Sequence, residues 1–335
     1  MRCFVTGASG FIGSNLVHAL VARGHQVRAL IRPHASQDLL RGLEIDLVQG
    51  DLADVRSLEA GLRGCDWCFH VAGCYSLWLA DYGVMFATNV EGTRNVLTAA
   101  GSARCRKIVY TSTVGCIGLP QTTNGSVPVA DETTPVDERQ MTCPYKLSKW
   151  RAEQEALALA RYGLPVIIVN PSTTIGPRDT RPTPSGRVIL DALQRRLPGY
   201  VDTGLNLVHV RDVAEGHILA AERGRPGERY ILGNAQGNWS LKKVLSVLES
   251  ITHISQPKLR FPYPLVLAAA HLNESLSRLT KRPPRIPLAG VRLARHKMFF
   301  NPRKAIIELG LPQTAPEQSI EDAAIWFREQ KLTSW

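Results

Sequence analysis

MRCFVTGASGFIGSN, residues 1–15, is the stretch that decides the fold. The apolar run at residues 3–5 predicts a short strand, and the pattern at residues 15–20 predicts a helix. Between them lie Gly7, Gly10 and Gly13. Glycine permits a tight turn and a close approach of the backbone to a pyrophosphate, which the N–H groups and positive dipole of a helix N-terminus attract. The order strand, glycine turn and helix therefore predicts a dinucleotide-binding loop.

Strand and helix patterns alternate from this loop as far as residue 170. Short runs rich in β-branched and apolar residues predict buried strands at residues 2–5, 26–31, 46–49, 67–71, 107–111 and 165–169. Such alternation is typical of an α/β protein with a Rossmann-type, doubly wound parallel sheet, whose binding crevice lies at the carboxyl ends of the strands. We therefore expect the functional residues directly after strands.

The alternation loosens after residue 170, where prolines become frequent. Further patterns predict helices at residues 186–196, 208–223 and 242–251, and a strand at residues 229–232. We expect a smaller, interleaved substrate domain in this half. The predicted division gives residues 1–170 to the dinucleotide-binding domain, with 205–235 returning to it, and residues 171–204 and 236–335 to the substrate domain.

The composition is that of a folded protein in a reducing compartment. Of 335 residues, 44% are hydrophobic and 21% charged. The glycine turn begins too early to leave room for a signal peptide, and seven cysteines, an odd number, do not suggest a disulfide framework. Cys65, Cys68 and Cys74 lack the second pair that a zinc site needs. We therefore expect a cytoplasmic protein without a bound metal.

Positive charge is concentrated near the C-terminus. The net charge is +11, and residues 281–304 contain eight Lys or Arg and no acidic residue. This basic face is either an ordinary solvated surface or a site for an anionic substrate or membrane surface. Nucleic acid is not expected, because no aromatic-interleaved motif accompanies the charge. The apolar helix pattern at 262–279 is either a buried core helix or, with the basic stretch, an interfacial patch for peripheral contact with the inner face of a membrane.

Residues that follow the predicted strands suit a nicotinamide dinucleotide. The second strand ends without the Asp or Glu that usually binds the ribose of NAD, and Arg32 follows it. An arginine there suits a 2′-phosphate and favours NADP over NAD, the alternative being a solvated side chain. Asp51 follows the third strand, where it can accept a hydrogen bond from adenine. After the fourth strand, the small residues Ala72 and Gly73 let a cofactor lie against the backbone.

Tyr145 and Lys149 are the strongest catalytic candidates. A spacing of four residues on a helix puts both side chains on one face. Tyrosine, with a pKa of about 10, is a poor acid or base at neutral pH, and we expect the ammonium to move its pKa toward working pH. The hydroxyl of Thr113, or of its competitor Ser112, lies at the end of the fifth strand and can orient a substrate oxygen beside the tyrosine.

Together these motifs resemble those of the extended short-chain dehydrogenase/reductases. The resemblance covers nearly the whole chain in the segments TGASGFIGSNL, GDLAD, FHVAG, NVEGTRNVL, YTSTVG, YKLSK, NPSTTIGP and LVHVRDVAEGH. Within that superfamily, VRALIRP, YVDTGLNLVHV and ERYILGN are similar to the dihydroflavonol reductase-like group, and most closely to bacterial proteins labelled hopanoid-associated sugar epimerase.

The resemblance implies a role for each residue that matches a family motif. Pyrophosphate would be bound by Gly7, Gly10, Phe11, Ile12 and Gly13. The adenosine half would be bound by Arg32, Asp51 and Leu52, and the remainder of the cofactor would be lined by Val71, Ala72 and Gly73 with support from Asn89. The nicotinamide carboxamide would lie against Pro171, Ser172, Thr173 and Thr174. The implied catalytic set is Thr113, Tyr145 and Lys149, where Thr113 replaces the commoner serine.

The residues favour an NADP-dependent reductase of a ketone or aldehyde, in hopanoid lipid biosynthesis if the resemblance extends that far. An epimerase or dehydratase acting on a nucleotide-sugar or sugar-lipid head group is the first alternative, because such enzymes share the Tyr and Lys but retain NAD. Asn170 stands where nucleotide-sugar epimerases often have arginine. A non-catalytic NADP sensor or scaffold is the second alternative, although such proteins usually lack the Tyr/Lys pair. The superfamily also implies a homodimer.

Overall fold

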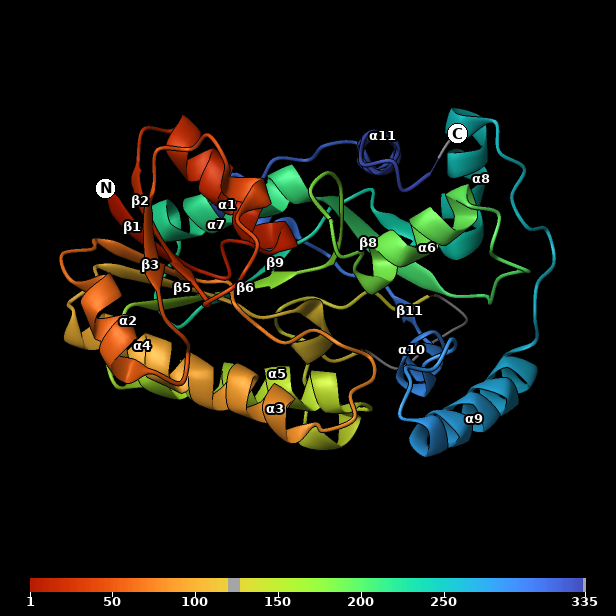
Figure 1. Ribbon diagram of the computed structural model, residues 1–335, viewed down its shortest axis with the longest axis horizontal. Helices are drawn as coiled ribbons and strands as arrows, with labels where there is room; N and C mark the ends of the chain where they lie inside the picture. Colours follow the sequence, from red (N-terminus) through yellow and green to blue (C-terminus); the bar gives the residue numbers. More distant parts are fainter. Residues whose placement is uncertain (120–126, 334–335) are drawn as a thin grey trace.

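A computed structural model describes residues 1–119 and 127–333 and shows two sheets side by side (Figure 1). The larger sheet is parallel throughout, in the order β3-β2-β1-β4-β5-β6-β9. Its strands are β1 (Arg2–Thr6), β2 (Gln26–Ile31), β3 (Asp46–Gln49), β4 (Trp67–His70), β5 (Lys107–Thr111), β6 (Val166–Pro171) and β9 (Arg229–Leu232). The predicted doubly wound α/β fold is confirmed.

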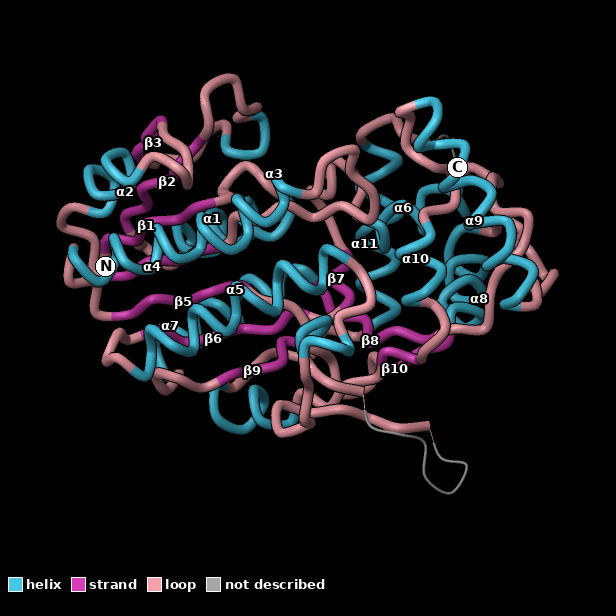
Figure 2. Tube along the Cα trace, turned by 90° about the horizontal axis from the view of Figure 1, so that it is seen from below, coloured by secondary structure: helices cyan, strands magenta, loops and turns pink. Residues whose placement is uncertain are grey.

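The alternation of side chains in the strands divides the apolar core between the two faces of this sheet. In β1, Cys3 and Val5 belong to the core on one face, and Phe4 belongs to the core on the other. The first face is covered by α1 (Phe11–Ala22) and α7 (Val210–Arg223). The second is covered by α2 (Val55–Leu62), α4 (Gly92–Ser102) and α5 (Pro144–Arg161), and Figure 2 shows α4 and α5 lying across the strands.

One predicted strand differs in its surroundings. Residues 46–49 form β3 as expected, but most of this strand is exposed. It lies at the edge of the sheet beyond β2, so one side has no partner strand among the described residues. The prediction of a buried strand was therefore wrong at this position.

The smaller sheet forms the second half of the molecule. It consists of β7 (Thr173–Ile175), β8 (Gly204–His209), β10 (Asn238–Ser240) and β11 (Lys297–Met298). Its apolar core is completed by α6 (Pro184–Leu193), α8 (Leu241–Thr252) and α11 (Pro316–Glu329). The helix that we expected at 208–223 begins at Val210, because the two residues before it end β8.

Two further helices lie at the outer edge of this half (Figure 1). These are α9 (Tyr263–Thr280) and α10 (Leu288–Leu293), which pack against each other. In α9 only Ala270 and Ser277 are buried. The alternative of a buried core helix is therefore wrong for this segment. Across residues 1–119 and 127–333, no helix has the length and apolar character that crossing a bilayer requires.

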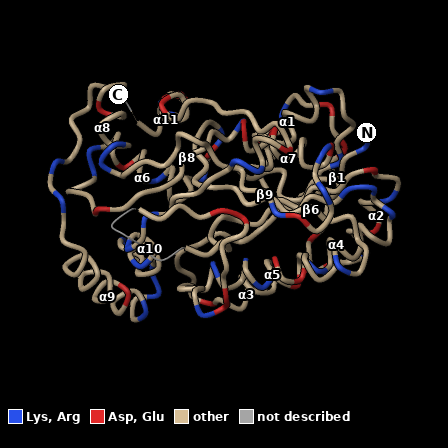
Figure 3. The backbone as a smooth tube through the Cα atoms, turned by 180° about the vertical axis from the view of Figure 1, so that it is seen from behind, with Lys and Arg blue, Asp and Glu red and all other residues tan. Residues whose placement is uncertain are grey.

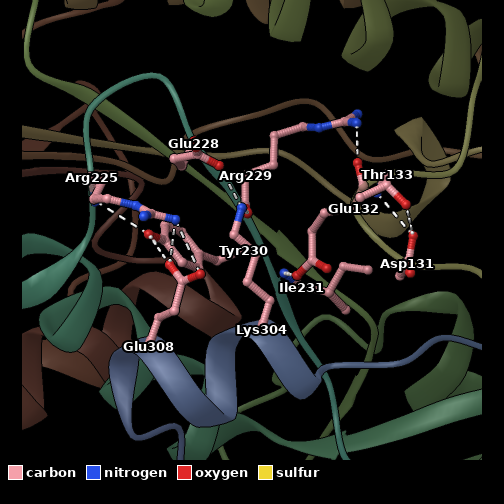
Figure 4. A network of polar contacts seen from close by, with 10 residues as sticks. All are labelled: Asp131, Glu132, Thr133, Arg225, Glu228, Arg229, Tyr230, Ile231, Lys304 and Glu308. Atoms are coloured by element: carbon pink, nitrogen blue, oxygen red, sulfur yellow. Dashed lines mark hydrogen bonds and ion pairs between the residues drawn. The ribbon is translucent and has the colours of Figure 1, made fainter.

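Polar contacts fix the last strand of the large sheet to segments far away in sequence (Figure 4). Lys304 donates to a carboxylate oxygen of Glu228 at 2.6 Å and to the carbonyl oxygen of Arg229 at 2.8 Å. On the other side, the backbone N–H of Ile231 donates to Glu132 at 2.8 Å. These contacts attach β9 to the turn at residues 131–133 and to the C-terminal segment.

Glu153 of α5 is the buried acid on which this region depends. Its carboxylate accepts from the guanidinium of Arg229 at 3.3 Å and from the side-chain amide of Asn170 at 2.8 Å. The side chain of Glu153 is fully buried. Two donors thus compensate a charge that would otherwise be costly inside the protein.

We expect Glu153→Ala to lower the free energy of unfolding by about 3 kcal/mol, because it removes the carboxylate that compensates the Arg229 charge and takes away one of the two acceptors of the Asn170 amide. Glu155→Ala is the matched control on the same helix. Glu155 pairs with Arg94 at 2.8 Å, but both side chains are partly exposed, so its loss should cost about 0.5 kcal/mol. Urea unfolding of both variants measures the difference. Equal losses would contradict the role of Glu153.

Candidate functional site

One continuous cavity of about 1670 Å³ runs from the large sheet to the small one. It opens at the carboxyl ends of β1 and β4, where the strand order changes direction, which is the usual binding crevice of doubly wound sheets. From there it extends to α6, α8 and α10. Its volume exceeds the roughly 300–1,000 Å³ of ordinary ligand pockets and gives room for a dinucleotide together with a substrate.

The glycine turn brings two backbone segments together at the mouth of this cavity. Gly7 has φ +72°, and a Cβ atom there would lie 2.6 Å from the backbone nitrogen of Ala72. A Cβ atom on Gly13 would overlap the carbonyl oxygen of Gly7. A side chain at Gly7 would push the turn after β1 away from the turn after β4, and a side chain at Gly13 would push α1 away from the turn after β1.

The N-terminus of α1 has the features of a pyrophosphate site. Its N-cap residue is Gly10, which supplies no side-chain cap. Phe11 and Ile12 of the first turn line the cavity with Gly10. The first N–H groups of a helix lack intrahelical acceptors, and the helix dipole favours an anion at this end. These residues therefore fit the phosphates of a dinucleotide.

The predicted adenosine residues also line the cavity. Arg32, Asp51 and Leu52 all do so. The Arg32 guanidinium is exposed and has no hydrogen bond or ion pair with any residue in the described ranges. The sequence interpretation missed Asp38, an acid at the same end. Its carboxylate pairs with Arg41 at 2.7 Å and accepts from Ser36 at 2.7 Å, so its charge is largely compensated.

The turn after β4 is held from behind by a buried chain of hydrogen bonds. Val71, Ala72 and Gly73 line the cavity. The Thr6 hydroxyl accepts from the Ala72 N–H at 3.2 Å and contacts His70 Nδ1 at 2.8 Å. Burial lowers the pKa of His70 to about 3, so the imidazole is neutral and acts as a hydrogen-bonding spacer.

Asn89 lies behind the turn that follows β4, where the resemblance implied a supporting residue. It is buried in the π-helical turn at residues 87–91, and it is not among the residues that line the cavity. Its amide donates to the carbonyl oxygen of Cys74 at 3.0 Å and to Ser148 at 2.9 Å, and its carbonyl oxygen accepts from the N–H of Cys74 at 2.7 Å. Asn89 therefore positions the turn after Gly73 rather than contacting a ligand.

Tyr145 stands in the cavity wall in the first turn of α5. Its hydroxyl shares a hydrogen bond with the side chain of Thr113, which lowers its pKa, but burial has the larger effect and raises the pKa well above that of free tyrosine. The expectation of a lowered pKa is therefore wrong for the protein alone. The ring of Tyr75, a residue that the sequence did not single out, packs on Tyr145 with centroids 4.5 Å apart.

Lys149 lies one helical turn behind Tyr145. Its ammonium donates to the carbonyl oxygen of Thr111 at 2.7 Å and lies 4.6 Å from the centre of the Tyr110 ring. Burial lowers the pKa of Lys149 to about 8, and Glu153 opposes this shift. Lys149 therefore carries its charge at neutral pH and loses it on mild alkalinisation.

Asn170, which stands where nucleotide-sugar epimerases often have arginine, holds the backbone at the end of β5. Its amide donates to the carbonyl oxygen of Thr113 at 3.0 Å as well as to Glu153. The residue thus fixes the backbone that carries the Thr113 hydroxyl. Ser112, the competing candidate, is also buried and lines the cavity. The bond to Tyr145 favours Thr113 for the catalytic position.

The end of β6, the start of β7 and the one-residue loop between them form another part of the cavity wall. Pro171, Ser172, Thr173 and Thr174 all line the cavity, as the resemblance implied for a nicotinamide-binding segment. The Ser172 hydroxyl donates to the side-chain oxygen of Asn206 in β8 at 2.8 Å. This bond joins the loop to the smaller sheet and fixes the two halves of the cavity relative to each other.

The far end of the cavity is mainly apolar. It is lined by side chains of α6, α8, β8 and the segment around α10, namely Val188, Ile189, Leu205, Leu207, Leu241, Val244, Leu293 and Met298. Two charged residues that the sequence interpretation missed, Asp179 and Lys146, lie nearer the catalytic residues. Burial raises the pKa of Asp179 to about 6 and lowers that of Lys146. The signal for Asp179 was its place two residues after the NPSTTIGP segment.

The chain is similar to a protein family, to named proteins and to solved structures. Residues 3–233 match the model of the family described as "NAD dependent epimerase/dehydratase family". A Synechocystis protein named "Putative dihydroflavonol 4-reductase" is 45% identical over 97% of this chain and 94% of its own length. The crystal structure of gox2253 has 43% identity and a TM-score of 0.87, and 99% of each chain is covered. A Stigmatella aurantiaca protein named "4-hydroxy-2-methyl-3-oxo-4-farnesyl-3,4-dihydroquinoline-1-oxide ketoreductase" is 35% identical over 96% of this chain and 95% of its own.

We expect affinity for NADPH to fall about tenfold between pH 7 and 9, because the Lys149 ammonium, with a pKa of about 8, is lost over this interval. A fluorescence titration with NADPH at each pH gives the dissociation constants. Lys149→Met should bind NADPH more weakly and without this pH dependence. Adenosine 2′,5′-bisphosphate, which lacks the nicotinamide half, serves as the control ligand. A wild-type affinity that does not change between these pH values would contradict the assignment.

Proposed function

Since the chain belongs to the NAD-dependent epimerase/dehydratase family, we propose that it is an oxidoreductase that reduces a ketone or aldehyde with NADPH. The observation that carries this proposal is the arrangement of Tyr145 in the cavity wall, with Thr113 bonded to its hydroxyl and Lys149 one turn behind. The two relatives with reductase names support reduction as the direction of the reaction.

The residues divide the work of carbonyl reduction among them. NADPH, when bound, supplies the hydride that is added to the carbonyl carbon. Thr113 and Tyr145 bind the carbonyl oxygen and so polarise it and hold it in place. Tyr145 then gives its phenolic proton to this oxygen, which completes the alcohol. Its raised pKa keeps the phenol protonated at neutral pH, which suits a proton donor better than a proton acceptor.

Lys149, one helical turn after Tyr145, supports this proton transfer. Its ammonium donates to the Thr111 carbonyl oxygen at 2.7 Å. Because Lys149 lies four residues after Tyr145 on the same face of the helix, its positive charge stabilises the phenolate that proton transfer leaves. The ammonium is also the group that would hold the nicotinamide ribose. Asn170 positions Thr113, and Glu153 in turn holds Asn170.

The preference for NADP rests on Arg32. The cavity at the end of β2 offers this exposed guanidinium, and Asp38, an acid between β2 and β3, already pairs with Arg41. A 2′-phosphate would supply the anion that Arg32 lacks among the described residues. Asp51 and Leu52 would then lie against the adenine.

The substrate that suits this cavity is an apolar carbonyl compound. Apolar side chains line its far end, whereas the polar groups gather near Tyr145. The ketoreductase relative, named for a substrate with a farnesyl chain, is in keeping with such a ligand. A place in hopanoid lipid biosynthesis, a cytoplasmic location and a homodimer stay predictions from the sequence.

Tyr145→Phe should lower the rate of NADPH oxidation with a long-chain methyl ketone or an aromatic aldehyde by at least about 100-fold, because it removes the proton donor. Its NADPH affinity should match that of the wild type, since the ring remains. Steady-state kinetics and a direct NADPH titration separate the two effects. Equal turnover by both proteins would refute the assigned role. Absence of turnover by the wild type with every carbonyl tested would favour the non-catalytic sensor instead.

Arg32→Ala should weaken NADPH binding about tenfold and leave NADH binding unchanged, because only NADPH carries the phosphate that the guanidinium would contact. Arg56→Ala is the control, since Arg56 is exposed at the start of α2 and is absent from the cavity wall. Calorimetric titration with each nucleotide measures the affinities, after a check for co-purified nucleotide. Retained NAD in the wild-type protein would instead favour the epimerase alternative.

A further inference from the structure

Helix α9 exposes an uninterrupted apolar face to solvent. Its members recur at intervals of three or four residues, which places them on one side of the helix: Leu265, Ala268, Leu272, Leu276 and Leu279. We call this set the leucine stripe. The four leucines are 59%, 75%, 58% and 84% exposed, in chain order. A surface helix normally turns its apolar side toward the core, whereas α9 turns this side toward solvent.

The opposite side of α9 is the one that contacts the protein. Ala270 and Ser277, the two buried residues of the helix, lie roughly half a turn away from the leucine stripe. That side packs against α10. The stripe is thus directed away from the rest of the molecule, and the helix sits at its outer edge (Figure 1).

Exposed cations surround the C-terminal end of the stripe. They are Arg278, Lys281, Arg282, Arg285, Arg292 and Arg295. Within the part of the chain that the structure describes, none of them forms an ion pair with an acidic side chain. Figure 3 shows Lys and Arg segments beside α9 and α10. An apolar face bordered by unpaired cations is the pattern of a helix that lies in the interface of an anionic bilayer.

The same feature argues against a second copy of this chain as the occupant. Pairing two leucine stripes would cover the leucines but would leave both sets of cations without an anionic partner. An anionic lipid surface instead complements both parts of the patch, because acyl chains accept the leucines and head groups accept the cations.

The position of the stripe relative to the cavity gives it a functional meaning. Helix α10 separates α9 from the cavity, and Gly290, Leu293, Ala294 and Met298 of this segment form part of the cavity wall. A membrane in contact with α9 would therefore lie one helix away from the apolar end of the substrate site.

We propose that the leucine stripe and its flanking cations dock this protein on anionic phospholipid bilayers, with the α10 side of the cavity turned toward the membrane. The docking itself is independent of the reaction. The corollary that an apolar carbonyl substrate is taken from the bilayer rests on the proposed function.

Flotation of the full-length protein with vesicles tests the docking. Vesicles of phosphatidylcholine and phosphatidylglycerol should carry the wild-type protein upward at low salt, and vesicles of phosphatidylcholine alone should carry at least tenfold less. The double variant Leu272→Glu/Leu276→Glu should lose at least tenfold in bound fraction, and Lys281→Glu/Arg282→Glu should lose the preference for the anionic lipid. Both changes are at exposed positions and should leave the fold intact.

Ile307→Glu is the matched control. Ile307 is 67% exposed but lies outside the stripe, so this variant should float like the wild type. Equal flotation of wild type and the Leu272→Glu/Leu276→Glu variant would overturn the proposal. So would sedimentation showing a wild-type dimer that this variant converts to a monomer, without any vesicle binding, since the occupant would then be a second copy.

A parallel assay separates this proposal from the proposed function. Turnover of a short, water-soluble ketone should be the same in the wild type and in the stripe variant, because the stripe is not part of the cavity wall. Flotation without turnover leaves the docking valid and counts against the reductase. Turnover without flotation counts against the docking alone.

Discussion

The contact between two backbone turns is the constraint on which the site depends. The turn after β1 reaches the turn after β4 at a distance that leaves no space for a Cβ atom on Gly7. Thr6, directly before that glycine, binds Ala72 and His70 in the same turn. The contact aligns the N-terminus of α1 with the small residues after β4, so one wall of the cavity is made of backbone. A ligand with phosphates at one end and a flat ring at the other fits such a wall without large side chains in between.

Helix α5 provides another wall of the cavity, and one of its faces carries both proposed catalytic residues and a residue that stabilises the fold. Tyr145, Lys149 and Glu153 are spaced four residues apart and face the sheet in succession. The first reaches the cavity, the second is fixed on the end of β5, and the third binds Asn170 and Arg229. The same helix face therefore holds the proposed proton donor and anchors β6 and β9. A change that disturbs this face would alter the fold and the catalytic geometry together.

Local patterns were sufficient to predict most of the large sheet, because its strands are short, apolar and separated by helices. The glycine turn and the Tyr145/Lys149 spacing likewise depend on neighbours in sequence. Residues 208 and 209 were misassigned because Val208 extends the apolar pattern of the helix that follows it. The role of Asn89 depends on the backbone of Cys74, and the pKa of Tyr145 depends on burial beside Tyr75 and Thr113. Such contacts between distant segments leave no periodic signal.

In helix α9, too, the sequence pattern predicts the element but not its contacts. Leucines at helical spacing predict a helix equally well whether they face a core or solvent, and only the packing of Ala270 and Ser277 decides which. The family match ends at residue 233, before α8, α9 and α10 begin. The matched part thus contains the glycine turn, the helix that carries Tyr145, and also α6 and β8 of the apolar end of the cavity. The part beyond it adds α8 and α10 to that end and presents the leucine stripe. Changes beyond residue 233 can therefore alter the substrate end and the surface contact together, since Thr113, Tyr145 and Lys149, the proposed catalytic residues, all lie before it.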